Sequence, residues 1–558
     1  MGQGEKKMAY SYHNFIFPFI WQLDKEKFDD IRTFFKSKGV WVDDDLIENE
    51  WSQIKTSNHS IRADGLNVNK LKYATYQYFK PAVRDAIFGG HNTDNQKEIV
   101  QSFSFNPIKE KNARYIIKKN DNEYNLKLAD IKLRLYNTGV GLLVFVCENF
   151  QCKHLDDIKC INEYGRHITL PFIPDDANNS IFVDSIRVKL DQKEDETEEN
   201  FRANIEAFNK SEGEEGKNNP NPNHIADFIK KILNYAAEAD KKTWTFTTNK
   251  ENKNQKGYWY IEPALDDRMF VMCVVNEDYQ IFFNTGGRCS PFEYINALGL
   301  GRVCSEEKCP DYENFEKSLY EFIFCDYPGG CSFSFRPMRQ QLIKDHVYYR
   351  WISQEYGTFY SVAAQAFTCV TNWDVGINYF RTEYYEMVCL VLAQRASIRA
   401  MQNEASELSV QMDKDDQRKE IANLQEKLIM FQNQINHYEV SSQEQAIELY
   451  DMIREIFLVN KYTGMLQEQL DGLYNVANIR QNVKFSKMGW FIAVVALFFA
   501  LPSFINDFAA FPEEWKMGDN SLVEYLSISE KYWIGIIVGK FVLLFLVIAI
   551  AIWNYKKK

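Results

Sequence analysis

Two apolar segments near the carboxy terminus constrain the fold of this chain more than any other feature of its sequence. Met488–Ile505 contains no charged residue, and Tyr532–Trp553 contains a single one, Lys540. A helix needs about 20 mostly apolar residues to cross the hydrocarbon core of a bilayer, and both segments are close to that length. We therefore predict two transmembrane helices, 488–505 and 532–553, joined by an extracytoplasmic loop over 506–531.

The charges around these segments predict an orientation. Arg480, Lys484 and Lys487 precede the first segment, a basic tail over 554–558 follows the second, and the loop between them is acidic. Positively charged flanks stay on the cytoplasmic side of a membrane. We expect a multi-pass protein of the inner or cell membrane, with the lipid bilayer as a partner and both termini in the cytoplasm.

The first 340 residues have the composition of a folded domain. Strand-like runs such as Phe15–Trp21 and Leu142–Val146 recur between turn residues, which predicts an α/β cytosolic sensor domain over 1–340. The segment 191–223 is too polar to bury a core, so we interpret it as a mobile insertion. The net charge of −12 disfavours direct nucleic-acid binding, and the eleven cysteines fit free thiols in a reducing compartment.

Helical periodicity dominates the next part of the chain, and we predict a helical stalk over 341–487. No proline occurs between Pro337 and Pro502. An apolar seam recurs at steps of three and four, at Ile421, Leu424, Leu428, Phe431, Ile435 and Tyr438. Such a seam packs against another helix. A similar spacing further on predicts one helix from Gln443 to Ile505, which needs partners from its own chain or from other copies.

A second stripe lies on that predicted long helix. Its members are polar before the first apolar segment, small within it and acidic at its end: Asn478, Asn482, Ser486, Gly489, Ala493, Ala496, Ala500, Ser503 and Asp507. In a ring of parallel helices this face would line an axial pore, and Asp507 would form a ring of carboxylates that collects cations. Close packing through small residues explains the same stripe, and both interpretations stay open.

From Tyr379 to Lys558 the chain resembles the CorA-type divalent cation channels. Phe508, Pro512, Glu513 and Trp515 match residues that follow the first membrane helix in that family, whereas Asp507 stands in the place of its Gly-Met-Asn signature. The resemblance implies a homopentamer whose first membrane helix lines the pore. It also implies a divalent cation such as Mg²⁺ as the permeant or regulatory ion, with selectivity altered by the carboxylate ring.

Two stretches of the first 340 residues, Tyr12–Phe19 and Thr138–Leu143, are similar to divergent CorA-like proteins that accompany type III CRISPR systems. That likeness implies an effector of antiviral defence, opened by an adenosine-type nucleotide messenger. The conjugate of S-adenosylmethionine with AMP (SAM-AMP) is the expected activating ligand. Arg336 and Arg339 are candidate ligand-binding residues, because arginines beside aromatic strands could hold a phosphate.

Two alternatives to a ligand-gated channel stay open. A housekeeping magnesium, cobalt or nickel transporter would share the architecture, and a membrane-tethered coiled-coil scaffold would need the seam without a pore. We expect no enzyme, because the eight histidines are dispersed and neither His-Glu-x-x-His nor Gly-x-Ser-x-Gly is present.

Overall fold

The computed structural model describes a large mixed sheet, helices on both of its faces and the helices that follow them. The described residues are 9–21, 35, 40–43, 74–89, 98–108, 112–169, 182–190, 196–204, 225–238, 245–249, 252, 258–276, 291–299, 312–330, 335–352, 356–410 and 417–509. Two compact units divide the chain between Leu470 and Asp471.

Fourteen described strands form the sheet. They are β1 (Ser11–Trp21), β2 (Trp41–Asp43), β3 (Val100–Phe105), β4 (Arg114–Lys119), β5 (Asn122–Tyr136), β6 (Val140–Asn149), β7 (Ser185–Lys189), β8 (Glu196–Asn200), β9 (Thr245–Thr247), β10 (Tyr258–Pro263), β11 (Phe270–Asn276), β12 (Val347–Tyr348), β13 (Thr358–Val362) and β14 (Ala366–Thr371). The main order is β12-β13-β14-β11-β1-β6-β5-β4-β7-β8, with β10 and β9 continuing from β1, and β3 and β2 from β5. Pairs are antiparallel except β11 with β14 and β9 with β10.

Strand β1 lies at the centre of the sheet and confirms the strand predicted over Phe15–Trp21. It pairs with β6 on one side, and with β11 and then β10 on the other. Pro18 lies where this second partner changes, because β11 pairs as far as Ile16 and β10 pairs from Phe19. A proline has no N–H for a ladder, so the changeover is where an interior strand tolerates it.

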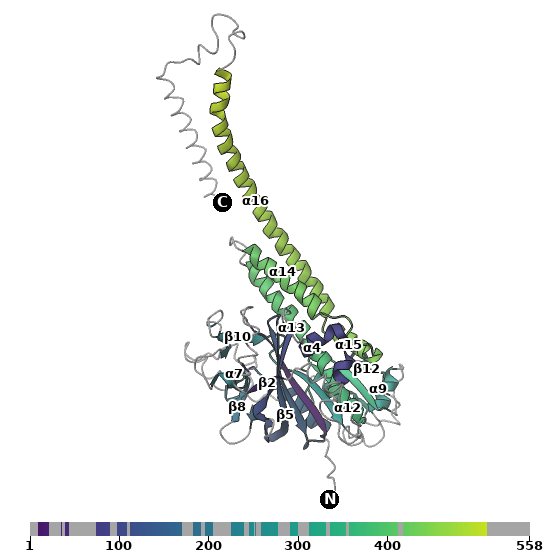
Figure 1. Cartoon of the computed structure of the whole chain (residues 1–558). Coiled ribbons are helices and arrows are strands. Elements are labelled where there is room, and N and C mark those ends of the chain that lie inside the picture. Colours follow the sequence, from purple (N-terminus) through teal and green to yellow (C-terminus); the bar gives the residue numbers. More distant parts are fainter. Residues whose placement is uncertain are drawn as a thin grey trace, which may run out of the picture. The chain divides into compact units, whose positions relative to one another are not determined.

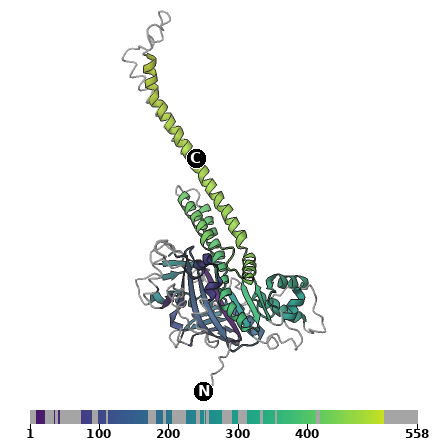
Figure 2. The same ribbon diagram turned by 45° about the vertical axis from the view of Figure 1, so that its right-hand side comes forward.

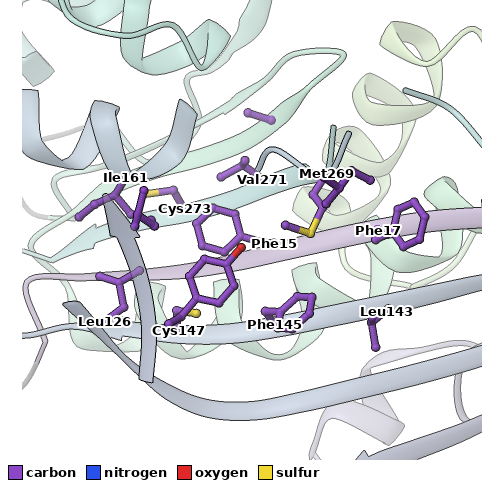
Figure 3. Close-up of a cluster of buried hydrophobic side chains, with 14 of the residues drawn as sticks. Phe15, Phe17, Leu126, Leu143, Phe145, Cys147, Ile161, Met269, Val271 and Cys273 are labelled. Atoms are coloured by element: carbon purple, nitrogen blue, oxygen red, sulfur yellow. The ribbon is translucent and has the colours of Figure 1, made fainter. Parts of the chain in front are cut away.

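One face of the sheet carries the main core. The helices on this side are α5 (Leu155–Gly165), α7 (Asp227–Glu238), α9 (Pro291–Gly299), α10 (Tyr312–Phe324) and α11 (Arg336–His346). Figure 3 shows part of this core, with Phe15 of β1, Phe145 of β6 and Ile161 of α5. Phe15 stacks on Tyr115 with ring centroids 5.3 Å apart, and the Tyr115 hydroxyl donates to the Gly165 carbonyl at 2.8 Å.

The other face is covered by α12 (Asp374–Arg381) and α13 (Glu383–Val410), and α13 packs against β1 and β6. Phe367 of β14 stacks on Phe380 of α12 with centroids 5.0 Å apart. Side chains of a strand alternate between the two faces, so β1 contacts both helical layers. We call the sheet and the helices up to α12, which include α4 (Pro81–Phe88) and the short η2 (Asn106–Ile108), the sheet domain.

The stalk helices are α13, α14 (Gln417–Gln434), α15 (Glu444–Ile456) and α16 (Val459–Ala509). Figures 1 and 2 both show α14 lying beside α13. The predicted seam is confirmed from Ile421 to Ile435, all of whose five members are buried, whereas Tyr438 is 69% exposed. The seam therefore packs within its own chain.

The prediction of one continuous helix from Gln443 to Ile505 is wrong. Helix α15 ends at Ile456, and α16 begins at Val459. Leu458 between them has φ of 53°, in the left-handed region that cannot continue a right-handed helix. The break carries neither glycine nor proline, so local sequence did not signal it.

The predicted pair of transmembrane helices is corrected by the structure. No helix in the described part of the chain is both long and apolar enough to cross a membrane. The predicted first span, 488–505, lies inside α16 and is 18 residues long, below the about 20 that a bilayer core needs. The predicted second span, 532–553, and tail, 554–558, lie outside the described residues. The predicted multi-pass architecture and the predicted membrane localisation rested on these two spans, so the same finding corrects both predictions.

The structure adds detail to other predicted segments. Strand β8 lies within the predicted insertion 191–223, where Glu199 is buried, and residues 205–223 lie outside the described part. Strands β12, β13 and β14 lie within the stretch predicted as stalk. Helix α16 reaches Ala509, inside the predicted loop 506–531. The seven cysteines that the structure describes are free thiols, as predicted.

Candidate functional site

The predicted pore-lining residues all lie on α16. Asn478 is half-buried, and five further members of the stripe are exposed: Asn482, Ser486, Gly489, Ala493 and Ala496. For Ala500, Ser503 and Asp507 the structure describes the helical backbone alone. The stripe is therefore continuous along the helix, and its five members from Asn482 to Ala496 are exposed in this chain.

Large apolar side chains flank this stripe on both sides. At about 100° per residue, one flank is formed by Val476, Ile479, Val483 and Trp490, and the other by Phe485, Met488, Ile492 and Phe499. All eight are exposed, and Ile479 and Phe499 reach 64% and 72%. Exposed apolar surface of this extent marks an interaction surface.

The predicted ligand-binding arginines lie in the first turn of α11, and both pair with Glu316 of α10. Arg339 is buried, with its guanidinium 2.7 Å from the carboxylate of Glu316, which is also fully buried. Tyr294 and Gln340 donate further hydrogen bonds to Glu316, at 3.0 and 2.9 Å. Arg336 is 44% exposed and 3.5 Å from the same carboxylate. We call these five residues the α11 cluster. The buried Arg339–Glu316 pair holds helix α10 against helix α11.

Sequence reasoning missed a second charged cluster, at the carboxy-terminal end of α5. Its residues come from three segments: α5 and its carboxy-terminal end, the turn before β11, and α10 with the residues that follow it. We call this set the α5 cluster: Lys159, Glu163, Arg166, Asp266, Asp267, Arg268, Glu321 and Asp326. Helix α5 can end here against the core because Gly165 has no side chain; a Cβ would lie 2.6 Å from the Phe15 ring.

The floor of the α5 cluster is a buried ion pair. Glu163 accepts hydrogen bonds from Arg166 Nε at 2.7 Å and lies 2.5 Å from Arg166 Nη2. Both residues are less than 5% exposed, yet Arg166 Nη1 has no hydrogen-bond partner among the described residues. Nearby, buried Lys159 donates to Glu321 at 2.6 Å. A buried donor without an acceptor is costly, and such sites often hold an unseen group.

The rim of the α5 cluster is more open and more loosely paired. The Arg268 side chain is 30% exposed and donates to Glu163 at 3.3 Å. Its Nε lies 3.8 Å from Asp266 and 3.7 Å from Asp267, distances too long for hydrogen bonds. Asp326, in the turn after α10, is grouped with the rim because the charges of Glu163 and Arg268 act on its pKa, and no described residue donates a hydrogen bond to its carboxylate.

Two rim carboxyls have perturbed acidity. Burial, followed by the charge of Glu163, raises the pKa of Asp326 to about 6. The hydrogen bond with Asp266, followed by burial, raises the pKa of Asp267 to about 6. Cys325, next to Asp326, is buried with φ of 60°, a conformation that costs a non-glycine residue energy. Perturbed acids and backbone strain concentrate at functional sites, which makes the rim the candidate ligand site.

A buried polar network near α5 is closed to substrates. His13 of β1 shares hydrogen bonds of 2.8 Å with Ser11 and with Asn162 of α5. Burial lowers the pKa of His13 to about 4, so its ring is neutral at pH 7. The three side chains resemble a nucleophile–base–orienter set, but none is more than 1% exposed. The network therefore ties β1 to α5 and is not arranged for catalysis.

On the opposite face, a buried ion pair ties the sheet to the stalk helices. Arg134 of β5 contacts Glu386 of α13 through both nitrogens, at 2.5 and 2.7 Å. Breaking a buried pair of this kind leaves an unpaired charge and is strongly destabilising. Helix α13 is therefore fixed to the sheet at its amino-terminal end.

A second buried arginine, Arg454 of α15, joins the stalk helices to one another. Its Nη1 donates to Gln394 of α13 at 3.1 Å, to Asn436 at 3.0 Å and to the His437 carbonyl at 2.8 Å. Its Nη2 donates to Asn460 in the first turn of α16 at 2.5 Å. Because one guanidinium spans the break between α15 and α16, it orients the start of α16 relative to α13.

Comparisons with protein-family models, with curated proteins and with solved structures find no match for this chain. The resemblance to CorA-type channels thus stays a prediction. The three segments of the α5 cluster are far apart in sequence, and the only local signal for them was the charged Asp266–Arg268 run directly before a predicted strand.

Proposed function

We propose that this chain forms a homo-oligomer through α16, and that the sheet domain controls a cation path at the centre of that oligomer in response to a small ligand. The proposal rests chiefly on the surface of α16, where a stripe of polar and small residues, exposed from Asn482 to Ala496, lies between two exposed apolar flanks. Two different flanks on one helix suit heterologous contacts, which form a ring when the rotation between neighbouring subunits closes. The stripe would then face the ring axis.

Control by the sheet domain is supported by the contacts at the base of the stalk helices. The Arg134–Glu386 pair holds α13 to β5, and Arg454 holds the start of α16 to α13. A small movement of the sheet would therefore reach α16 through directly packed, hydrogen-bonded elements. Helix shifts of this kind are common switching transitions.

The ligand and the ion in this proposal rest on the resemblance found in the sequence. The ligand is an adenosine-type messenger such as SAM-AMP, and the ion is a divalent cation such as Mg²⁺. A transporter controlled by its own cargo is the second candidate, distinguished by inhibition with internal magnesium. The scaffold alternative loses support, because the seam from Ile421 to Ile435 is buried inside its own chain.

The test combines subunit counting with cation binding. The purified full chain is studied with and without SAM-AMP, Mg²⁺ binding is measured by isothermal titration calorimetry, and the number of subunits is measured by native mass spectrometry. We expect three or more subunits and Mg²⁺ binding that requires the ligand. Ile479→Asp should reduce the subunit number, because it places a charge in the apolar flank, whereas Asn482→Asp in the stripe should preserve it. A monomer, a dimer, or absence of Mg²⁺ binding under all conditions would contradict the proposal.

A further inference from the structure

Arg395 of α13 is a half-buried cation for which the described part of the chain supplies no counter-ion. Its guanidinium lies over the ring of Tyr462 of α16, 3.8 Å from the ring centroid. Burial lowers the pKa of Arg395, and the charge of Arg399 lowers it further. A charge that leaves water without an opposite charge is costly, so its presence here requires an explanation.

The buried arginines of the ion pairs described above differ from Arg395. Arg134, Arg166 and Arg339 each lie 2.5–2.7 Å from a glutamate. The half-exposed Arg268 of the rim lies 3.3–3.8 Å from three carboxylates. A phosphate group at any of these arginines would be repelled by the carboxylates already present. At Arg395 no carboxylate from the described residues pairs with the guanidinium, so a phosphate would meet no such competitor.

A second arginine lies one turn further along α13. Arg399 follows Arg395 at a spacing of four, which places the two side chains on the same face of the helix as neighbouring like charges. It is exposed, and no acid in the described ranges forms an ion pair with it. Three and four positions to either side of each arginine, α13 carries no acid, and the same holds for α16 around Tyr462. An anion bound by both guanidinium groups would relieve their repulsion.

These two arginines lie close to the start of α16. Tyr462, which contacts Arg395, is in the first turn of that helix. Arg454 donates hydrogen bonds to Gln394, which precedes Arg395 in α13, and to Asn460, two residues before Tyr462. A ligand bound there would therefore contact α13 and α16 where the buried Arg454 already joins them.

We propose that Arg395 and Arg399 bind the phosphate group of a nucleotide, with its base against the exposed part of the Tyr462 ring. Guanidinium groups suit phosphate, because their planar donors form paired, charge-assisted hydrogen bonds with its oxygens. Tyr462 is half-buried, so part of its ring is accessible for stacking with a base. The proposal rests on the ligand control proposed above and deepens it, since it names the residues that take the ligand. Binding itself requires neither oligomerisation nor a cation path.

The experiment uses the full-length protein and three probes in isothermal titration calorimetry at pH 7.5, where a phosphate monoester carries nearly two negative charges. AMP offers both the phosphate and the base, inorganic phosphate only the first and adenosine only the second. We expect AMP to bind about tenfold more tightly than either of the other probes, since each lacks one contact of about 1.4 kcal/mol. No binding of AMP, or an equal affinity for AMP and either of the other probes, would overturn the proposal.

Matched variants assign the phosphate contact. Arg399→Gln removes an exposed charge and should weaken AMP about tenfold while leaving the affinity for adenosine unchanged. Arg395→Lys keeps the charge but loses the planar donors, and should weaken AMP to a similar extent. Arg187→Gln is the control, because Arg187 is a partly exposed arginine of β7 that lies 2.6 Å from Glu123. Circular dichroism checks that each variant folds. An equal loss of affinity in Arg187→Gln, or none in Arg399→Gln, would exclude the site.

A contact between copies of the chain is the competing explanation of these arginines, because acids of a second copy could pair with them. Native mass spectrometry of Arg399→Gln distinguishes the two explanations. We expect the number of subunits to stay unchanged while the affinity for AMP falls. Fewer subunits together with an unchanged affinity for AMP would overturn the nucleotide site.

The outcomes separate this proposal from the proposed function. AMP binding that depends on Arg399 in a chain that remains monomeric would support the site and contradict the oligomer with a central cation path. An oligomer that binds Mg²⁺ only with SAM-AMP, but whose affinity for AMP is the same in Arg399→Gln, would do the reverse.

Discussion

The α11 cluster and the α5 cluster each place a buried glutamate beside two arginines, but they differ in the groups that surround that ion pair. Glu316 in the α11 cluster receives hydrogen bonds from Arg339, Tyr294 and Gln340, and it is fully buried. In the α5 cluster Glu163 and Arg166 are similarly buried. By contrast, Arg268 makes one long hydrogen bond to Glu163 and longer contacts with two aspartates, and Asp326 accepts no hydrogen bond from a described residue. Enclosure, rather than residue type, thus decides which cluster can accept a ligand.

The largest expected effect comes from opening the closed cluster. Glu316→Ala should lower the free energy of unfolding by about 3–5 kcal/mol, because it leaves the buried Arg339 without its carboxylate. Urea unfolding followed by the fluorescence of the buried Trp21, Trp41 and Trp259 would measure this loss. A loss below about 1 kcal/mol would mean that the α11 cluster is no more enclosed than a surface pair.

A smaller loss is expected from the floor of the open cluster. Glu163→Gln keeps an acceptor for Arg166 but removes the charge, so we expect a loss of about 2 kcal/mol in the same urea experiment. Glu316→Gln is the matched substitution in the α11 cluster. If Glu163→Gln lowered the free energy of unfolding clearly more than Glu316→Gln, the buried ion pair of the α5 cluster would be the stronger of the two, and the comparison would be contradicted.

The rim should change the pH dependence of stability. The pKa of Asp326 is about 6 in the folded protein and 3.8 in its unperturbed state, so the folded state binds more protons between these values. The contribution of Asp326 to stability therefore falls as pH rises from about 4 to about 6. Asp326→Asn should remove this loss and, after allowance for solvent screening, stabilise the protein at pH 7 by about 1 kcal/mol.

Asp267 provides the comparison for that measurement, since its pKa is also about 6 but its side chain is 59% exposed. Asp267→Asn should change the pH profile less than Asp326→Asn does. Identical urea midpoints for wild type and Asp326→Asn at pH 4 and pH 7 would show that Asp326 is not perturbed in the fold.

The smallest effects are expected from the two half-exposed arginines. Arg336→Ala and Arg268→Ala should each change the free energy of unfolding by less than about 1 kcal/mol, because exposed pairs contribute little. A loss above about 2 kcal/mol for Arg268→Ala would make the rim a structural element like the α11 cluster.

Local sequence patterns predicted the helices and strands that are determined by residues close together in the chain. The strand β1 was predictable as a short, continuous apolar run, which is buried at nearly every position, and the seam from Ile421 to Ile435 was predictable from its spacing of three and four. The apolar content of 488–505 led to the prediction of a membrane span, which the described helices do not support. That prediction used the length and apolar character of the segment and the charges on either side of it.

Features that depend on distant residues were not predictable. Nothing near Arg339 indicates that its partner is Glu316, in another helix, and the α5 cluster unites three separate segments. The break at Leu458 is bridged by Arg454, whose partners include Gln394, sixty positions earlier in the chain. The sequence supplies these residues, but only the folded sheet and its helices bring them together.

The left-handed Leu458 has a consequence for the rotational phase of α16. Arg454, before this joint, donates a hydrogen bond to Asn460, after it. The joint therefore sets the directions in which the first side chains of α16 point. Inserting one residue after Leu458 would turn the start of α16 by about 100° about its own axis, and deleting one would turn it equally far the other way. A single joint therefore decides which side of the first turns of α16, up to Leu470, packs against the rest of its compact unit.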